Sequence, residues 1–367
     1  MQNGLLSRAR SCAAIVVALT ATLTGLASCG GSDGGMLSPT RFKATAVVSD
    51  GAIAAPHTDP NLKNAWGVAF NPQGFVWVAN NGSQTATLYD GNGVVQSLVV
   101  SIPATASGPA NPTGIVFNNG ADVTIARNGK SGTAAFIFAG EGGSITAWAP
   151  AVDTTHAFTV ADSSASGAVY KGLAIAATAS GHRFYASDFH NNKIDVFDAT
   201  FTPITVSGGF RDPQIPAGFA PFGIQTIGAK IFVTYAKQDA DMHDDVPGAG
   251  NGFIDVFDVD GTLLQRFAQN GQLNASWGVA LAPGNFGTFS NTILVGNFGD
   301  GTIDAFDPTT GAFVGQLMNS DGTPLVQRGL WGIAFGNNLN AQPSNTLFFA
   351  AGPNFEADGV YGCIDMQ

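Results

Sequence analysis

Charged residues are scarce in this sequence of 367 residues, and acidic ones outnumber basic ones. Only 11% of the residues are Asp, Glu, Lys or Arg, and the formal net charge is −11. Proteins that bind nucleic acid present a basic stripe, and proteins held to anionic lipid by charge need basic clusters. The composition therefore argues against nucleic acid as a partner and against electrostatic adhesion to a membrane.

Short catalytic motifs are also missing from the body of the chain. After residue 40 the sequence has no Gly-x-Ser-x-Gly nucleophile elbow, no His-Glu-x-x-His zinc motif and no Cys-x-x-Cys pair. The glycine-rich stretch 248–252 lies between two expected strands, so it is not a dinucleotide-binding fingerprint. The body of the chain therefore offers only thin signatures of catalysis.

The N-terminal segment has the features of an export signal. Arg8 and Arg10 form a basic region, an apolar run covers residues 13–23, and the sequence Leu-Ala-Ser-Cys follows at residues 26–29. The apolar run is too short for a membrane-spanning helix. The four residues that end at Cys29 resemble the lipobox of bacterial lipoproteins. An ordinary secretory signal that ends at a small-residue cleavage site is the alternative.

The lipobox resemblance implies that residues 1–28 are a signal peptide and that Cys29 carries a diacylglycerol and an acyl chain. Such chains would anchor the protein to a membrane leaflet without a spanning segment. Gly30 follows Cys29, and by resemblance to Gram-negative lipoproteins this implies an exported protein on the outer membrane. Residues 29–40 would form a flexible, glycine-rich tether. The other mature cysteine, Cys363, lies in an apolar alternation and is predicted to be a small core residue.

Glycine and short apolar runs dominate the rest of the chain. The sequence holds 48 Gly and 27 Phe, and no helix-length amphipathic pattern occurs in the body. Short β-branched and aromatic runs bounded by Gly, Asn, Asp and Pro are typical of strands joined by tight turns. A Gly-[Val/Ile/Leu] motif recurs roughly every fifty residues, which is the range of propeller repeats. Its glycines are Gly67, Gly114, Gly172, Gly223, Gly278 and Gly332.

Each repeat has four expected strands except the sixth, which ends one strand short. Residues 42–49 form an apolar run that precedes the first repeat and belongs to no other unit. If this run pairs with the last strand of the chain, the ring closes and leaves only short, protected edges. We therefore predict an all-β fold over residues 41–367: a six-bladed β-propeller of four-stranded blades, closed by the N-terminal strand that completes the last blade.

The body resembles NHL-type β-propellers, whose blades end in a pattern close to [IR]-x-V-F-D. Residues 193–198 (KIDVFD) and 302–307 (TIDAFD) match it best. More specifically, residues 59–365 look like an uncharacterised family of secreted bacterial propellers, some of which carry a PEP-CTERM sorting tail that this chain lacks. The resemblance implies the fold, but it supplies no settled activity.

The loops that precede the first strand and follow the second strand of a blade share one face of a propeller. Aromatic side chains that recur there could form a funnel for sugars or flat apolar ligands, with amides to orient them. The alternative is that these aromatics pack blade against blade as part of the core. The predicted ligand-binding residues are Trp66, Phe222, Trp277, Trp331, Asn80, Asn297 and Asn354.

Acidic residues cluster in the stretch 238–252, where carboxylates at nearby positions precede a flexible Pro-Gly segment. Oxygen ligands in a pliable loop suit Ca²⁺, although the pattern is not that of an EF-hand. A solvated acidic loop is the alternative. The predicted metal ligands are Asp239, Asp241, Asp244 and Asp245. A second candidate set for Ca²⁺ consists of Glu141, Asn80, Asn297 and Asp300.

Candidates for catalysis are few. Lys171, Asp188 and His190 all fall in the third repeat near the channel, and His190 could act as a base. The sequence thus predicts a cell-envelope lipoprotein that serves as a binding or scaffold module through its loop face, with an envelope protein or glycan as partner. The alternative is a metal-dependent hydrolase of the lactonase or esterase type, which rests on analogy with enzymes of the same fold.

Overall fold

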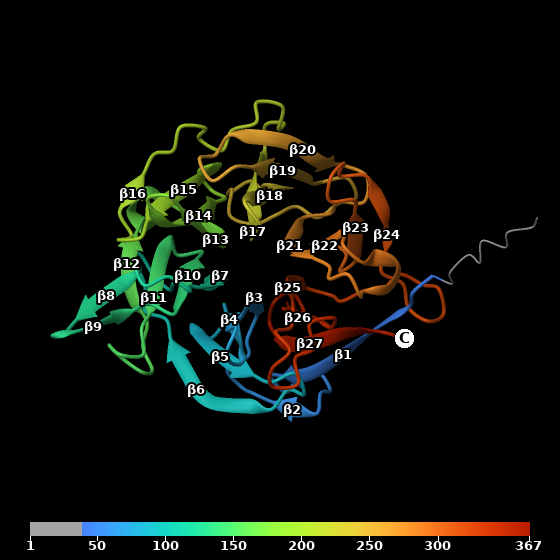
Figure 1. Cartoon of the computed structure of the whole chain (residues 1–367), viewed down its shortest axis with the longest axis horizontal. Coiled ribbons are helices and arrows are strands. Elements are labelled where there is room, and N and C mark those ends of the chain that lie inside the picture. The colour runs from blue at the N-terminus through green and yellow to red at the C-terminus, as the bar shows by residue number, and fades with distance from the viewer. Residues whose placement is uncertain (1–38) are drawn as a thin grey trace, which may run out of the picture. The chain divides into compact units, whose positions relative to one another are not determined.

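Residues 39–367 form a closed ring of six β-sheets in the computed structural model, which describes this part of the chain (Figure 1). Each of the six sheets is a blade built on four antiparallel strands, so the predicted six-bladed propeller is confirmed. The predicted signal peptide, Cys29 and most of the tether lie outside the described residues. Residues 39–367 contain no helix with the length and apolarity that crossing a membrane requires.

The first three blades follow one another along the chain, each beginning with the strand nearest the axis. Blade 1 contains β3 (Ala65–Phe70), β4 (Val76–Asn80), β5 (Thr85–Tyr89) and β6 (Val95–Ser101). Blade 2 contains β7 (Pro112–Phe117), β10 (Phe136–Gly140), β11 (Ser144–Trp148) and β12 (Phe158–Asp162), with a separate hairpin of β8 (Thr124–Arg127) and β9 (Lys130–Thr133) inserted after β7. Blade 3 contains β13 (Tyr170–Thr178), β14 (Gly181–Asp188), β15 (Lys193–Asp198) and β16 (Pro203–Ile204).

The other three blades complete the ring. Blade 4 contains β17 (Phe219–Ile227), β18 (Lys230–Lys237), β19 (Phe253–Phe257) and β20 (Leu263–Gln269). Blade 5 contains β21 (Ser276–Leu281), β22 (Ile293–Asn297), β23 (Ile303–Phe306) and β24 (Phe313–Gln316). Blade 6 contains β25 (Leu330–Phe335), β26 (Leu347–Ala351) and β27 (Val360–Met366), followed by β1 (Phe42–Ser49) and β2 (His57–Thr58) from the start of the described chain.

Strand β1 closes the ring as the sequence predicts. It pairs antiparallel with β27, from Phe42 opposite Met366 to Ser49 opposite Val360, and the two strands lie side by side in Figure 1. The ring of Phe42 is buried and lies 5.0 Å, centre to centre, from the ring of Phe286. One detail differs from the prediction, because β2 pairs parallel with β1 and makes blade 6 five-stranded.

The core lies between neighbouring blades rather than in one central mass. Phe232 and Ile254 of blade 4, for example, pack with Val279 and Val295 of blade 5 in one buried cluster. Similar clusters fill the other spaces between blades, and Cys363 is buried in one of them, which confirms its predicted core position. Burying both faces of each blade in this way gives a stiff frame for the loops.

The motif glycines mark the places where first strands of adjacent blades nearly touch. A Cβ atom added to Gly223 would lie 2.0 Å from the carbonyl oxygen of Trp277, and one on Gly332 would lie 2.5 Å from the carbonyl oxygen of Trp66. The same close approach occurs around the ring at Gly67, Gly114, Gly172 and Gly278. The repeat that reveals the fold in the sequence is therefore a packing requirement of the channel wall.

Gly223→Ala is expected to destabilise the protein by about 2–3 kcal/mol, because the added methyl group would force two backbones apart. Gly284→Ala is the matched control, since its Cβ would meet only two side-chain atoms of Asn291, at 3.5 and 3.9 Å. Urea unfolding of both variants measures the difference. Equal stability of the two variants would contradict this account of the repeat.

Candidate functional site

The candidate site lies where the channel opens among the loops before the first strands and after the second strands. Glu141 lies in the turn between β10 and β11, and Lys171 lies at the start of β13. Asp244 comes from the loop between β18 and β19, and Glu356 comes from the loop between β26 and β27. We call the region around these four residues the mouth. Four different blades supply its side chains.

Aromatic rings close the channel beneath the mouth. Trp66 and Trp331 stack with ring centres 3.6 Å apart, and Phe298 stacks on Trp331 at 3.9 Å. Trp277 meets the first two rings edge-on, and Phe222 lies 5.8 Å from Trp331. Three of the four predicted funnel aromatics are buried, and Trp277 is half-buried. The rings thus pack on one another across the axis and form a floor rather than an open funnel.

Lys171 is a buried cation at the centre of the mouth. Its side chain is 2% exposed, and its Nζ donates hydrogen bonds to Glu141 and, over 3.1 Å, to Oδ1 of Asp244. The ammonium also lies 5.3 Å from the ring centre of Trp66, within cation–π range. Burial lowers the pKa of Lys171, but the two carboxylates outweigh burial and leave that pKa raised. A lysine that acts as a base or nucleophile needs a lowered pKa, so this one is better suited to hold charge.

Hydrogen bonds extend from Lys171 into the neighbouring blades. Oε2 of Glu141 accepts a hydrogen bond of 2.8 Å from Asn81, whose Oδ1 accepts one of 3.3 Å from Asn64. On the other side, Asp244 and Nδ1 of His243 are 2.8 Å apart. The hydrogen bond between them lowers the pKa of Asp244 and raises the pKa of His243. The network therefore fixes the mouth across blades 1 to 4.

Two further carboxyls at the mouth have oxygens without a hydrogen-bond donor. Oδ2 of Asp245 and Oε1 of Glu356 are buried atoms, and no described residue donates to either of them. Burial raises the pKa of Asp245 to about 7, although Lys171 opposes the shift. Burial, and then the charge of Glu141, raise the pKa of Glu356 to about 7. The mouth therefore has more acidic groups than its one lysine can neutralise.

A strained turn presents Glu356 to the mouth. Asn354, Phe355 and Glu356 have φ angles of +55°, +56° and +66°, in the left-handed region that residues with a side chain rarely adopt. Each such residue costs about 1 kcal/mol or more and persists where other contacts impose the conformation. The turn leaves the ring of Phe355 fully exposed while Glu356 is half-buried, with its Oε1 out of contact with solvent. An exposed aromatic therefore stands beside an unpaired carboxyl.

The three catalytic candidates lie in blade 3, but no hydrogen bond joins them to one another. Asp188 accepts hydrogen bonds from the backbone of Val169 and from Asn191, and burial raises its pKa. Asp188 therefore stabilises the turn after β14, whereas Lys171 pairs with Glu141 and Asp244. His190 is half-buried in that turn, and among residues 39–367 no side chain forms a hydrogen bond with its imidazole. The structure does not assemble a catalytic group from these residues.

The predicted amides and the second Ca²⁺ set stay within their own blades. Asn80 donates to Thr87 in blade 1 over 2.9 Å, and the exposed Asn354 donates to Asp358. In blade 5, Asn297 donates to Asp304 over 2.8 Å, and Asp300 accepts from Asn274 over 2.9 Å. Because these side chains are committed to local partners, the structure does not gather them around Glu141.

The acidic loop contributes Asp244 and Asp245 to the mouth and directs its other two carboxylates elsewhere. Asp239 accepts a hydrogen bond from the backbone of His243 over 2.9 Å, and Asp241 is exposed. Ligand atoms of Glu141, His243 and Asp244 lie within 4.8 Å of one another, a spacing that could hold a metal ion. Two of these three groups already bind the ammonium of Lys171, so Ca²⁺ would have to displace that charge.

The protein is expected to lose stability as the pH rises from about 4.5 to 7. In the unfolded chain Asp245 and Glu356 ionise near 3.8 and 4.5, whereas their pKa in the folded protein is about 7. The folded state then binds more protons in this window, so raising the pH favours unfolding by on the order of 2 kcal/mol per carboxyl. The double variant Asp245→Asn, Glu356→Gln should show a flatter dependence in urea unfolding at pH 5 and pH 8. Identical pH dependence of the two proteins would contradict the raised pKa values.

Fold and site together define a six-bladed β-propeller with an acidic mouth over an aromatic floor. No family model matches the chain. It is 35% identical over 333 residues to uncharacterized protein R648 of Acanthamoeba polyphaga mimivirus, covering 89% of this chain and 80% of that protein. It is 33% identical to uncharacterized protein L690 of the same virus, covering 88% and 85%. The chain belongs to the family of these viral proteins, whereas the sequence resemblance pointed to a secreted bacterial family.

Solved structures share the fold at low sequence identity. The soluble aldose sugar dehydrogenase from Escherichia coli, in its apo-form, matches with a TM-score of 0.53 and 11% identity, over 88% of this chain and 99% of that chain. The PQQ-bound aldose sugar dehydrogenase from Streptomyces coelicolor matches with a TM-score of 0.51 and 12% identity, over 89% and 98%. At these identities the likeness extends to the fold alone.

Proposed function

We propose that this protein is a binding module that captures its partner at the mouth through a positively charged group on the partner, such as an ammonium or guanidinium. The observation that carries this proposal is the pair of buried carboxyl oxygens, on Asp245 and Glu356, that lack a donor. Buried polar atoms without a partner are costly, and a cationic donor would relieve both. Such a ligand would also lower the pKa of both carboxyls and so favour their ionised form at neutral pH.

The surroundings of the two carboxyls favour binding over chemistry. Lys171 is charged and held by Glu141 and Asp244, so it sets the geometry of the mouth without being free to attack a substrate. The exposed ring of Phe355 offers an apolar contact next to the charge site. A ligand with a cationic group attached to an apolar stem would engage both features.

The N-terminal sequence supports an extension of the proposal to the cell envelope. A lipid on Cys29 would keep the propeller close to a membrane surface, where an envelope protein or glycan that carries amino groups could be the partner. Mass spectrometry of the mature N-terminus tests the anchor. An unmodified Cys29, or a first residue other than Cys29, would refute it.

An array of short peptides tests the mouth. Peptides that contain Lys or Arg are expected to bind, and matched peptides with acetyl-lysine or citrulline are not. The double variant Asp245→Asn, Glu356→Gln should lower the affinity about tenfold or more, since hydrogen bonds to charged groups contribute about 1.5–3 kcal/mol each. Asp241→Asn, an exposed carboxylate of the same loop, is the matched control and should change nothing. The proposal would be overturned if charged and neutral peptides bind with equal affinity, or if the double variant binds as tightly as the original protein.

A further inference from the structure

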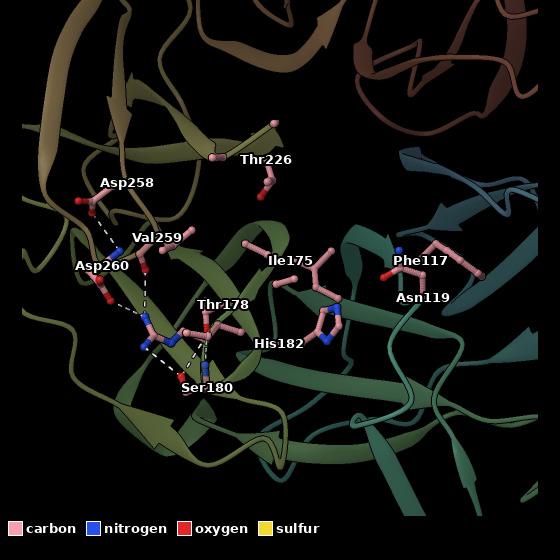
Figure 2. A pocket seen from close by; sticks show the side chains of 16 residues that line it. Phe117, Asn119, Ile175, Thr178, Ser180, His182, Thr226, Asp258, Val259 and Asp260 are labelled. Carbon is pink, nitrogen blue, oxygen red and sulfur yellow. Dashed lines mark hydrogen bonds and ion pairs between the residues drawn. The ribbon is translucent and has the colours of Figure 1, made fainter.

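A pocket of about 920 Å³ lies at the opposite end of β13 from Lys171, where the first strands of blades 2, 3 and 4 end (Figure 2). Blade 2 contributes Phe117 and Asn119, blade 3 contributes the β13–β14 turn, and blade 4 contributes Thr226 and the turn after β19. The volume is within the range of small-molecule sites. This pocket shares no residue with the mouth, so the inference below is independent of the proposed function.

Charged side chains on one wall are fixed before any ligand arrives. Nη1 of Arg183 donates to Oδ1 of Asp260 over 2.7 Å and to the carbonyl oxygen of Val259 over 3.2 Å. Oδ1 of Asp258 accepts backbone hydrogen bonds from Asp260 and Thr262. In Figure 2, Asp258, Val259 and Asp260 lie along one edge of the pocket, with dashed lines marking their contacts. The guanidinium of Arg183 and the carboxylates of Asp258 and Asp260 are thus already held in place. A ligand would therefore lose little binding free energy to the ordering of these side chains.

A histidine on the blade 3 side is fixed in the same manner. Nδ1 of His182 is 2.7 Å from Oδ1 of Asp122, and the backbone N–H of His182 donates to the other oxygen of that carboxylate over 2.8 Å. This pairing leaves Nε2 of the ring available for another hydrogen bond. In Figure 2, the ring of His182 lies beside Ile175 at the pocket.

One hydroxyl in the pocket lacks any partner. Oγ1 of Thr226 is a buried atom with no hydrogen bond in the described part of the chain. In Figure 2, Thr226 lies across the hollow from Thr178, whose own hydroxyl donates to the carbonyl oxygen of Gly181 over 2.7 Å. The remaining lining is small and apolar, chiefly Ala176 and Ala177. The pocket therefore combines an apolar floor with fixed polar groups and one unsatisfied hydroxyl.

We infer that this pocket binds a neutral saccharide. The charge of Arg183 is balanced by Asp260, and Asp258 lines the same wall, so the pocket has no excess positive charge for an anion. The remaining carboxylate, Asp258, already accepts two backbone hydrogen bonds, so it is not free to bind a cation. A purely apolar ligand would leave Thr226 and Asn119 without partners. A sugar has hydroxyls for the planar side chains and C–H faces for the alanine floor and Phe117.

An array of neutral glycans tests the inference on the full chain. The probes are glucose, galactose, mannose, N-acetylglucosamine and their disaccharides, and calorimetry then measures the affinity of those that bind. Ala177→Trp should fill the pocket and abolish binding. Ala312→Trp, an exposed alanine in blade 5, is the matched control and should bind like the unaltered protein.

Thr226→Val separates a binding role from a structural one. The change removes the unpartnered hydroxyl, so the melting temperature should stay the same or rise, while the saccharide affinity falls about fivefold through loss of one hydrogen bond. The inference is overturned if no glycan binds, if Ala177→Trp binds normally, or if Thr226→Val lowers the melting temperature and leaves the affinity unchanged.

Discussion

A chain that lacks residues 39–50 is expected to fail to fold into a stable propeller, because blade 6 loses strand β1. That strand pairs along its length with β27 and buries Phe42, Val47 and Val48. Without it β27 becomes an exposed edge next to an open core, which favours aggregation. Circular dichroism and size-exclusion chromatography of the shortened chain measure the loss.

Point variants within β1 separate burial from chain length. Phe42→Ala should cost about 3–4 kcal/mol, the usual loss for a buried aromatic. Lys43→Ala, an exposed position on the same strand, should change stability by less than about 0.5 kcal/mol. A shortened chain that unfolds cooperatively at the original temperature would show that β1 does not close the ring.

Lys171→Met is expected to destabilise the protein by about 3–4 kcal/mol at neutral pH. The change leaves the buried carboxylate of Glu141 without its cation, and breaking a buried ion pair by removal of one partner is strongly unfavourable. The unpaired carboxyl should take up a proton in the folded state, so the loss should shrink as the pH falls. Urea unfolding at pH 5 and pH 8 measures both effects.

Lys193→Met is the matched control for this prediction. Lys193 is on the same blade and pairs with Asp195 over 2.7 Å, but 47% of its side chain is exposed. Exposed pairs contribute about 1 kcal/mol or less, so this variant should remain close to the original stability. If both lysine variants lose the same stability, the ammonium of Lys171 is not what balances the mouth.

The fold could be predicted from the sequence because its signal is local and repeated. The motif glycines recur since every pair of adjacent first strands approaches too closely for a side chain, as Gly223 and Trp277 do. The closing strand could be predicted because residues 42–49 had no other partner. The short β2 carries no comparable pattern, and its pairing depends on the chain turning back beside β1.

The sequence predicts which face of the propeller carries the mouth. It does not predict which side chains contact one another there. Lys171 meets Glu141 and Asp244 across 30 and 73 residues of sequence, and no pattern ties such distant side chains together. The turn at residues 354–356 holds no glycine, although all three residues adopt positive φ. Nothing in their types indicates that Glu356 would turn inward and Phe355 outward.

The ladder between β1 and β27 also has a mechanical consequence. Phe42 pairs with Met366 at the N-terminal end of this ladder, so a force applied there in the direction of the strand would load the whole ladder in shear. The backbone hydrogen bonds between Phe42 and Ser49 would then resist sliding together instead of opening one at a time. If the N-terminus is anchored and a partner bound to the loops exerts a force on the propeller, the β1–β27 pairing would therefore resist that force.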